Sequence, residues 1–273
     1  MKNFVGSVAM TERFVWSGGM DALLDEVAVV QVGSLTVGRF GGATAAGATQ
    51  NHDATFAASA SDGCWECAAI LDAHGSDDSA RVVVDAFEMS LDQIQTALSQ
   101  PVWEALPAFQ ALVIRILTLG ETASLLASCQ AETAVLAVAR RDRFIAWTSV
   151  GDNSLLMLHP ELARLGQYQL NQRQFFEWVG KADSLRLPVP CCSSGIRELR
   201  EGRSCIALVT DGLLESSDLT AAPIALYEDS FSSSTPEAVH RALSRVQDRD
   251  GRDSATIVAW DAVSSVPGLV PTD

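Results

Sequence analysis

Asp72 and His74 lie two residues apart at the end of a short apolar run, residues 68–71. The run is typical of a buried strand, so we expect both side chains at the mouth of that strand. A carboxylate and an imidazole in this position can bind a metal ion or transfer a proton. A serine and two acids follow at 76–78, which predicts that a helix begins there with Ser76 as its cap.

Further aspartates stand at similar places along the chain. Asp53, Asp211 and Asp253 mark strand boundaries, and Asp152 lies in an expected hairpin turn. Any one of them taken alone is best explained as a residue that turns the chain. The set, together with a histidine, favours a metal site, because clustered carboxylates repel each other unless cations lie between them.

The expected ligands are all oxygen atoms, which suit Mg²⁺ or Mn²⁺ better than zinc. Two such ions would bring positive charge to a phosphate, lower the pKa of a bound water and hold both oxygens of an in-line displacement. His74 would protonate the departing alkoxide, because the pKa of histidine lies near neutrality. The sequence therefore predicts a metal-assisted phosphate ester hydrolase.

The composition is that of a folded and strongly acidic chain. Of its 273 residues 48% are hydrophobic, and the formal charge is −15 with a pI near 4.6. Nucleic acid is excluded as a partner, because binding its phosphates requires a basic surface. Arg115 and Arg140 interrupt the longest apolar runs, and residues 1–10 lack the apolar core of a secretory signal. We expect no membrane partner and a cytoplasmic location.

The apolar pattern predicts an alternation of strands and helices. Helices are predicted at 80–98, at 102–116 with an extension towards 128, at 171–180 and at 236–246. Strands are predicted as one or two within 26–40, and at 54–59, 64–71, 133–139, 144–150, 154–158, 204–209 and 255–260. Residues 262–273 are predicted to be a tail. This order indicates an α+β domain with layers around antiparallel strands.

Six short motifs occur along the chain. They are Asn51-His52-Asp53, Leu71-Asp72-Ala73-His74-Gly75, Glu132-Thr133-Ala134-Val135, Val150-Gly151-Asp152-Asn153, Val209-Thr210-Asp211-Gly212 and Asp253-Ser254-Ala255-Thr256. In order and rough spacing they resemble those of the metal-dependent protein phosphatases (PPM, or protein phosphatase 2C). Residues 172–180 and 195–199 further resemble a bacterial branch of that family. One motif of this length is weak evidence, whereas an ordered series from about 38 to about 260 is strong.

The resemblance implies a fold and an activity. The fold would be a four-layer αββα sandwich, a central antiparallel β-sandwich flanked by helix pairs, with residues 1–273 as one domain. The activity would be that of a serine/threonine protein phosphatase, a metal-dependent hydrolase of phosphoserine and phosphothreonine esters in signalling. The cofactors would be two Mn²⁺ or Mg²⁺ ions with a weaker third, and the partners a phosphorylated protein and a cognate kinase.

The resemblance also implies the site residues by position. The metal-binding set would be Asp53, Asp72, Ala73 (through its backbone carbonyl), Asp152, Asp211 and Asp253. Asp72 would bridge both ions, and Asp53 would also be catalytic because it would orient metal-bound water. His74 would be the general acid, and Asp152 would serve the weaker third ion.

Three residues depart from the family pattern. Ala48 stands where the family usually has an arginine that grips the substrate phosphate, and His52 replaces an acid. Ala73 replaces a glycine, which leaves its carbonyl available if φ is negative but costs about 1 kcal/mol or more if φ is positive. The metal-binding aspartates are intact, so the departures weaken the hold on phosphate rather than on metal.

The sequence leaves three other interpretations open. The fold could be retained as a non-catalytic binding or signalling module, with catalysis lost at Ala48 and His52. The adjacent His52 and Asp53 suggest a His-Asp phosphohydrolase, but that family is helical and this region predicts strands. Cys64 and Cys67 have the spacing of a zinc or redox pair, but without a second pair they are better explained as core residues.

Overall fold

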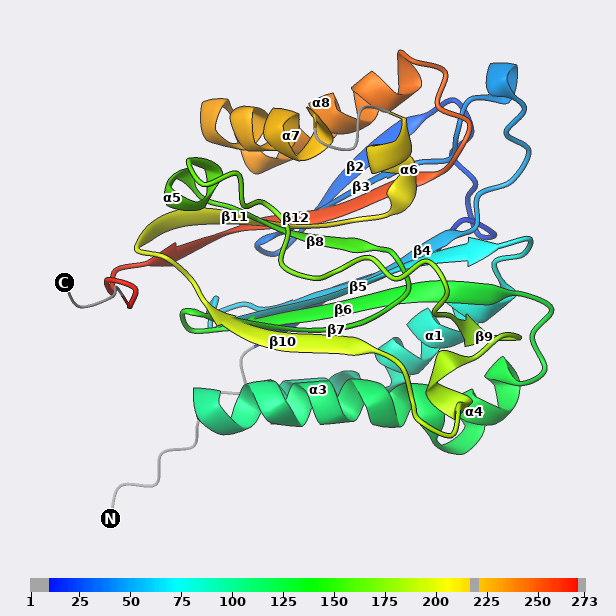
Figure 1. Cartoon of the computed structure of the whole chain (residues 1–273), viewed down its shortest axis with the longest axis horizontal. Coiled ribbons are helices and arrows are strands. Elements are labelled where there is room, and N and C mark those ends of the chain that lie inside the picture. Colours follow the sequence, from blue (N-terminus) through cyan, green and yellow to red (C-terminus); the bar gives the residue numbers. More distant parts are fainter. Residues whose placement is uncertain (1–9, 217–220, 270–273) are drawn as a thin grey trace.

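Two antiparallel β-sheets face each other at the centre of the computed structural model, which describes residues 10–216 and 221–269 (Figure 1). The first sheet contains, in spatial order, β1 (Thr11–Ser17), β4 (Asp53–Ala60), β5 (Trp65–His74), β6 (Glu132–Arg141), β7 (Phe144–Val150) and β10 (Ser193–Glu198), and β9 (Val179–Gly180) pairs with β6. The second contains β2 (Val27–Val32), β3 (Leu35–Phe40), β12 (Ala255–Ser264), β11 (Gly202–Val209) and β8 (Ser154–Leu158).

Helices cover the outer face of each sheet (Figure 1). The first sheet carries α1 (Asp78–Met89), α2 (Leu91–Leu98), α3 (Val102–Thr118) and α4 (Gly120–Leu126). The second carries α6 (Asp211–Glu215), α7 (Ala221–Ser232) and α8 (Thr235–Gln247). The short helices α5 (Pro160–Ala163), η1 (Thr44–Ala46) and η2 (Ser184–Arg186) lie in connections. The predicted four-layer αββα sandwich is confirmed.

Three apolar layers fill the interior: one lies between the two sheets, and one lies between each sheet and the helices that cover it. Strand β5 contributes to two of them, because its side chains alternate between its faces: Leu71 packs against the helices, whereas Ile70 packs towards the second sheet. The middle of a strand that is buried on both faces carries apolar side chains on both, so residues 67–71 of β5 form a continuous apolar run. The run predicts the strand well but not its end.

Strand β5 extends further than predicted. It continues through His74 because β6 pairs with it along its whole length, with His74 opposite Glu132. Asp72 and His74 therefore lie inside the strand rather than beyond it. The strands predicted at 144–150 and 154–158 are confirmed as β7 and β8, and the region 26–40 holds two strands.

The helices near these strands begin and end differently from the prediction. The Ser76 hydroxyl accepts the Asp78 N–H at 3.2 Å, but α1 begins at Asp78 and its cap position is Asp77. The single helix predicted at 80–98 is two helices, because the chain leaves helical geometry at Ser90 (φ −93°, ψ 6°). The apolar periodicity continues through this break, so it did not reveal it.

Two predictions about connections are wrong. Residues 151–153 do not form a hairpin turn, because β7 belongs to the first sheet and β8 to the second. Residues 171–180 are not a helix: they form an irregular segment that ends in β9. The Gln174 N–H donates to the Gly151 carbonyl at 3.0 Å, and Asn171 receives the Leu155 N–H at 2.7 Å, so contacts with the 151–155 region replace helical bonds.

The predicted tail begins later than expected. Strand β12 continues to Ser264, because Ala262 and Ser264 pair with Ser204 and Gly202 of β11. Residues 265–269 have no regular structure, and the rest of the predicted tail, 270–273, lies outside the described residues.

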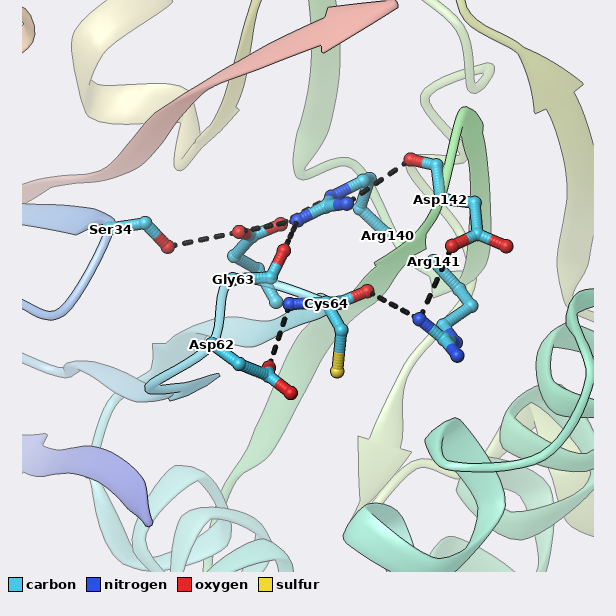
Figure 2. Close-up of polar contacts among 8 residues, drawn as sticks. Ser34, Asp62, Gly63, Cys64, Arg140, Arg141 and Asp142 are labelled. Carbon is cyan, nitrogen blue, oxygen red and sulfur yellow. Dashed lines mark hydrogen bonds and ion pairs between the residues drawn. The ribbon is translucent and has the colours of Figure 1, made fainter. Parts of the chain in front are cut away.

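The turn between β4 and β5 is joined to the neighbouring turn between β6 and β7. Figure 2 shows Arg140 donating to the Gly63 carbonyl and Arg141 donating to the Cys64 carbonyl. Arg140 also pairs with the buried Glu66 at 2.5 Å, and Ser34 of the second sheet's β2–β3 turn donates to the same carboxylate at 3.0 Å. This network ties the two sheets together at the end of β5 opposite Asp72.

Within the described residues no single helix has the length and apolar composition to cross a membrane. Helices α3 and α4 would pass that test only together, and they are bent by 51° from each other. The apolar side chains of α3, such as Phe109 and Val113, belong to the layer packed on the first sheet.

Candidate metal centre

Asp53 and Asp72 lie directly opposite each other at one end of the first sheet, in the antiparallel pair β4 and β5. Their neighbours Ala54 and Leu71 pack towards the helices. Because side chains alternate along a strand, both carboxylates point the other way, towards the second sheet. They therefore stand at the edge of the space between the sheets.

The second sheet brings Asp211 and Asp253 to the same end of the sandwich. Asp211 begins α6 directly after β11, and Asp253 precedes β12, which pairs with β11. A Cβ atom at Gly212 would lie 1.9 Å from the Ser254 carbonyl oxygen. The glycine therefore allows the first turn of α6 to lie against the chain beside Asp253.

Asp53 is fully buried, and hydroxyl groups of the second sheet surround its carboxylate. Ser254 donates to Oδ1 at 2.9 Å, while Thr256 and Thr210 donate to Oδ2 at 2.7 and 3.1 Å. Burial raises the pKa of Asp53 to about 7, although the hydroxyl of Thr256 opposes that rise. Protein donors thus already satisfy this carboxylate, and its predicted role in orienting a metal-bound water stays a prediction.

The carboxyl group of Asp72 lies close to those of Asp53 and Asp211. Burial, followed by the charges of Asp53 and Asp211, raises the pKa of Asp72 well above its ordinary value. Burial also raises the pKa of Asp211. Carboxyl groups that are buried together repel each other when ionised, so this pair favours a proton or a cation between them.

Asp253 lies closer to the surface and has two imidazoles near it. Burial raises the pKa of Asp253, while the Ser254 N–H and the nearby His74 and His52 lower it. His74 is exposed, and its ring packs edge-on against Trp178 with ring centroids 4.8 Å apart. The structure thus places the predicted general acid at the solvent edge of the acidic cluster.

Asp152 is paired with Arg173, which the sequence analysis did not predict as a site residue. The Nη2 atom of Arg173 lies 3.4 Å from Asp152 Oδ2, 3.3 Å from Glu215 Oε1 and 3.9 Å from Asp211 Oδ2. Its Nε atom donates to the Asp152 carbonyl at 2.9 Å. A guanidinium therefore lies between Asp152 and the aspartates already described.

The donor set fits hard divalent cations. Asp211 Oδ1 and Asp152 Oδ1 are buried and have no hydrogen-bond partner in the described part of the chain. Such oxygens are costly unless satisfied, and Mg²⁺ or Mn²⁺ is satisfied by carboxylate oxygens. No three carboxylate, imidazole or thiol groups of residues 10–216 and 221–269 already stand as a ligand set. A divalent cation bound here would offset the mutual repulsion of the buried carboxylates.

Ala73 lies in the extended strand β5, with Thr133 opposite it. Its φ is not positive, since the left-handed residue after Asp72 is Gly75 (φ 85°). The Thr133 hydroxyl donates to the Asp72 carbonyl at 3.0 Å, which fixes the backbone directly before Ala73. The replacement of glycine by alanine is therefore unstrained here.

A polar cavity of about 370 Å³ opens beside Asp253. Its lining includes both departures that concern phosphate, Ala48 and His52, together with Arg252. His52 Nε2 lies 2.8 Å from Gln50 Oε1, which fixes the imidazole. Arg252 is exposed and has no ion-pair partner among the described residues.

Sequence reasoning missed two kinds of site residue. The hydroxyl donors to Asp53 could have been found, because Thr210 directly precedes Asp211 and Ser254 directly follows Asp253. The arginines carried no comparable signal: Arg173 lies in a segment predicted to be helical, and Arg252 lies among the charged residues 248–252.

Comparison with protein-family models and with curated proteins finds no match to this chain. Solved structures do match it. The catalytic domain of the serine/threonine protein phosphatase PstP, in complex with two manganese ions, aligns with a TM-score of 0.56 and 15% identity over 93% of this chain and 98% of that one.

Two further solved structures align with this chain. The S. agalactiae serine/threonine phosphatase aligns with a TM-score of 0.52 and 14% identity over 93% of this chain and 100% of that one. RsbX in complex with magnesium aligns with a TM-score of 0.54 and 13% identity over 86% and 100%. At such identities the comparison establishes the architecture: the chain has the fold of bacterial serine/threonine protein phosphatases.

Proposed function

We propose that the chain is a metal-dependent phosphatase of the PPM family that hydrolyses phosphoserine and phosphothreonine esters in proteins. The observation that carries the proposal is the convergence of Asp72, Asp211 and Asp253 from two sheets, with His74 beside them. Carboxylates whose pKa values are raised by burial and by each other are typical of functional sites. The fold shared with PstP supports the proposal by analogy.

Asp72, Asp211 and Asp253 would hold the cations, and Ala73 would add its backbone carbonyl. Two bound Mn²⁺ or Mg²⁺ ions would supply positive charge to the phosphate and lower the pKa of water. Three hydroxyl groups donate to Asp53 and hold its carboxylate in place, from where it would orient a metal-bound water.

His74 would protonate the alkoxide of the departing serine or threonine. This leaving group is a strong base, so protonation in the transition state speeds its departure. The imidazole lies near Asp253 and its ring is oriented by Trp178. Its exposure leaves it accessible to a substrate that arrives from solvent.

The cavity beside Asp253 would receive the phosphate. Arg252 and His52 both line it, and Arg252 is a cation without an ion-pair partner among the described residues. A guanidinium binds phosphate oxygens strongly and in a defined geometry. Arg252, which lies just before β12, would therefore supply the positive charge that an arginine at position 48 supplies in the family pattern.

The test is release of phosphate from a phosphoserine peptide by the purified protein with and without Mn²⁺. We expect Mn²⁺-dependent release that Asp72→Asn reduces by about 100-fold or more, since even outer-shell changes cost 10–100-fold. Asp85→Asn is the matched control, because Asp85 is an exposed acid of α1. No release at saturating Mn²⁺, or full activity of Asp72→Asn, would refute the proposal.

A non-catalytic module with the same fold is the second candidate. Ala48 and the engagement of Asp152 by Arg173 are the observations that favour it. Calorimetry with a non-hydrolysable phosphopeptide separates the two: a module binds the peptide or another partner but releases no phosphate at any Mn²⁺ concentration.

A further inference from the structure

Arg173 neutralises one side of the acidic cluster from within the protein. Its guanidinium contacts carboxylates from two separate elements, Asp152 after β7 and Asp211 and Glu215 on α6. The Arg173 side chain is only 10% exposed, and the Asp152 side chain only 7%. An arginine in such surroundings stays charged, because its guanidinium cannot be deprotonated in proteins.

Several contacts keep the guanidinium in place. Arg173 Nε donates to the Asp152 carbonyl at 2.9 Å, and the next residue, Gln174, donates its N–H to Gly151 at 3.0 Å. The guanidinium carbon also lies 4.8 Å from the ring centroid of Phe175. On the other side of Arg173, the Asn171 side-chain amide donates to the Asn153 carbonyl at 2.7 Å, so the segment is bound to residues 151–153 before and after Arg173.

The same carboxylates have unused acceptor capacity. The Asp152 side chain is more than nine-tenths buried and that of Asp211 is 12% exposed, and each has an Oδ1 atom without a hydrogen-bond partner in the described residues. Without the guanidinium, these oxygens and those of Glu215 would form an oxygen-rich site typical of a hard divalent cation. A cation and a guanidinium cannot share that space, because like charges at a few ångströms repel strongly.

We propose that Arg173 is a fixed counterion that takes the place of a divalent cation at Asp152 and Glu215 and confines metal binding to the side of Asp72, Asp211 and Asp253. The identity of the metals rests on the proposed function. The consequence is specific to this chain: it binds no ion at Asp152, and replacing Arg173 by a neutral residue creates a cation site there.

The experiment is calorimetric titration of the metal-free full chain with Mn²⁺, with the stoichiometry as readout. Arg173→Gln should bind one more Mn²⁺ than the unmodified protein, and the double variant Arg173→Gln/Asp152→Asn should lose that ion again. Arg173→Lys keeps the charge and should keep the original stoichiometry. Arg200→Gln is the control, since Arg200 pairs with Glu161 away from the site.

Equal stoichiometry of Arg173→Gln and the unmodified protein, with both folded by circular dichroism, would overturn the inference. So would loss of Mn²⁺ from the unmodified protein on Asp152→Asn alone, because Asp152 would then already be a ligand. If the unmodified protein binds no Mn²⁺ while Arg173→Gln binds one, the inference stands and the proposed metal-dependent function fails.

Discussion

Asp53 and Asp72 occupy opposed positions of one strand pair, yet their surroundings are chemically different. Three hydroxyl groups donate to Asp53, whereas the carboxyl neighbour of Asp72 is Asp211, which carries the same charge. Hydroxyl donors stabilise a buried carboxylate, whereas a neighbouring carboxylate destabilises it. Asp72 is therefore the acid of this pair that an added cation stabilises most.

Replacing Thr256 by valine should destabilise the protein by about 1–3 kcal/mol, because it leaves the buried Asp53 without one donor. Thr256 makes the shortest of the three hydroxyl contacts, 2.7 Å. Urea denaturation of the metal-free protein measures the change. Thr256→Ser keeps the hydroxyl and should stay close to the parent; equal stability of the valine and serine variants would contradict this role.

The stability of the metal-free protein should decrease as the pH rises from about 4 to about 7. Burial raises the pKa of Asp53 from 3.8 to about 7, so in this interval the folded state holds a proton that the unfolded state has released. The stabilisation that the protonated Asp53 gives the folded state is complete below about pH 4 and is lost as the pH passes about 7. Urea denaturation in EDTA at several pH values tests it.

In the Asp53→Asn variant the side chain at position 53 cannot titrate, so the stability of the metal-free protein should change less between pH 4 and pH 7. Mn²⁺ added at pH 7 should restore stability to the unsubstituted protein, because a cation compensates the charges of the neighbouring acids. A metal-free protein whose stability increases from pH 4 to pH 7 would show that the raised pKa is absent.

His74→Gln should slow hydrolysis of a phosphoserine peptide by about 100-fold or more, the range for loss of a general acid. An aryl phosphate has a good leaving group that needs no proton, so its hydrolysis should change little. The ratio of the two kcat values is the measurement. His240→Gln, on the exposed surface of α8, is the control, and an equal loss with both substrates would assign His74 a different role.

Arg252→Ala should raise KM for the phosphopeptide about tenfold or more with a smaller effect on kcat, since hydrogen bonds between charged groups contribute roughly 1.5–3 kcal/mol. Arg249→Ala is a matched control, because that arginine lines a different cavity. Ala48→Arg places a second guanidinium at the same cavity and should lower KM. Unchanged KM in Arg252→Ala would place the phosphate elsewhere.

Arg140→Ala should destabilise the fold by about 3–5 kcal/mol, because it leaves Glu66 buried and unpaired at the end of β5 far from the metal centre. The more exposed pair of Arg143 and Glu198 is the comparison, and Arg143→Ala should cost at most about 1 kcal/mol. Replacing both Glu66 and Arg140 by methionine should recover most of the loss. Chemical denaturation measures all three variants.

The elements that the sequence predicted well are those in which a local pattern reports burial. The strands β7 and β8 are short apolar segments bounded by turn residues, and the aspartates at strand ends follow from the same boundaries. The segment 171–180 was mispredicted because its local composition permits a helix, whereas hydrogen bonds from Asn171 and Gln174 to the 151–155 region determine its path.

The sequence by itself determined the layered α+β class, the motifs and the aspartates that mark strand ends, because each depends on residues that are neighbours along the chain. Only the tertiary structure decided which of these acids meet and what compensates their charge. Asp53 and its donor Ser254 are 201 residues apart, and Asp152 and Arg173 meet through a segment with no regular structure. Contacts of this kind leave no periodicity in the sequence, because they depend on how the two sheets pack against each other rather than on the conformation of either strand.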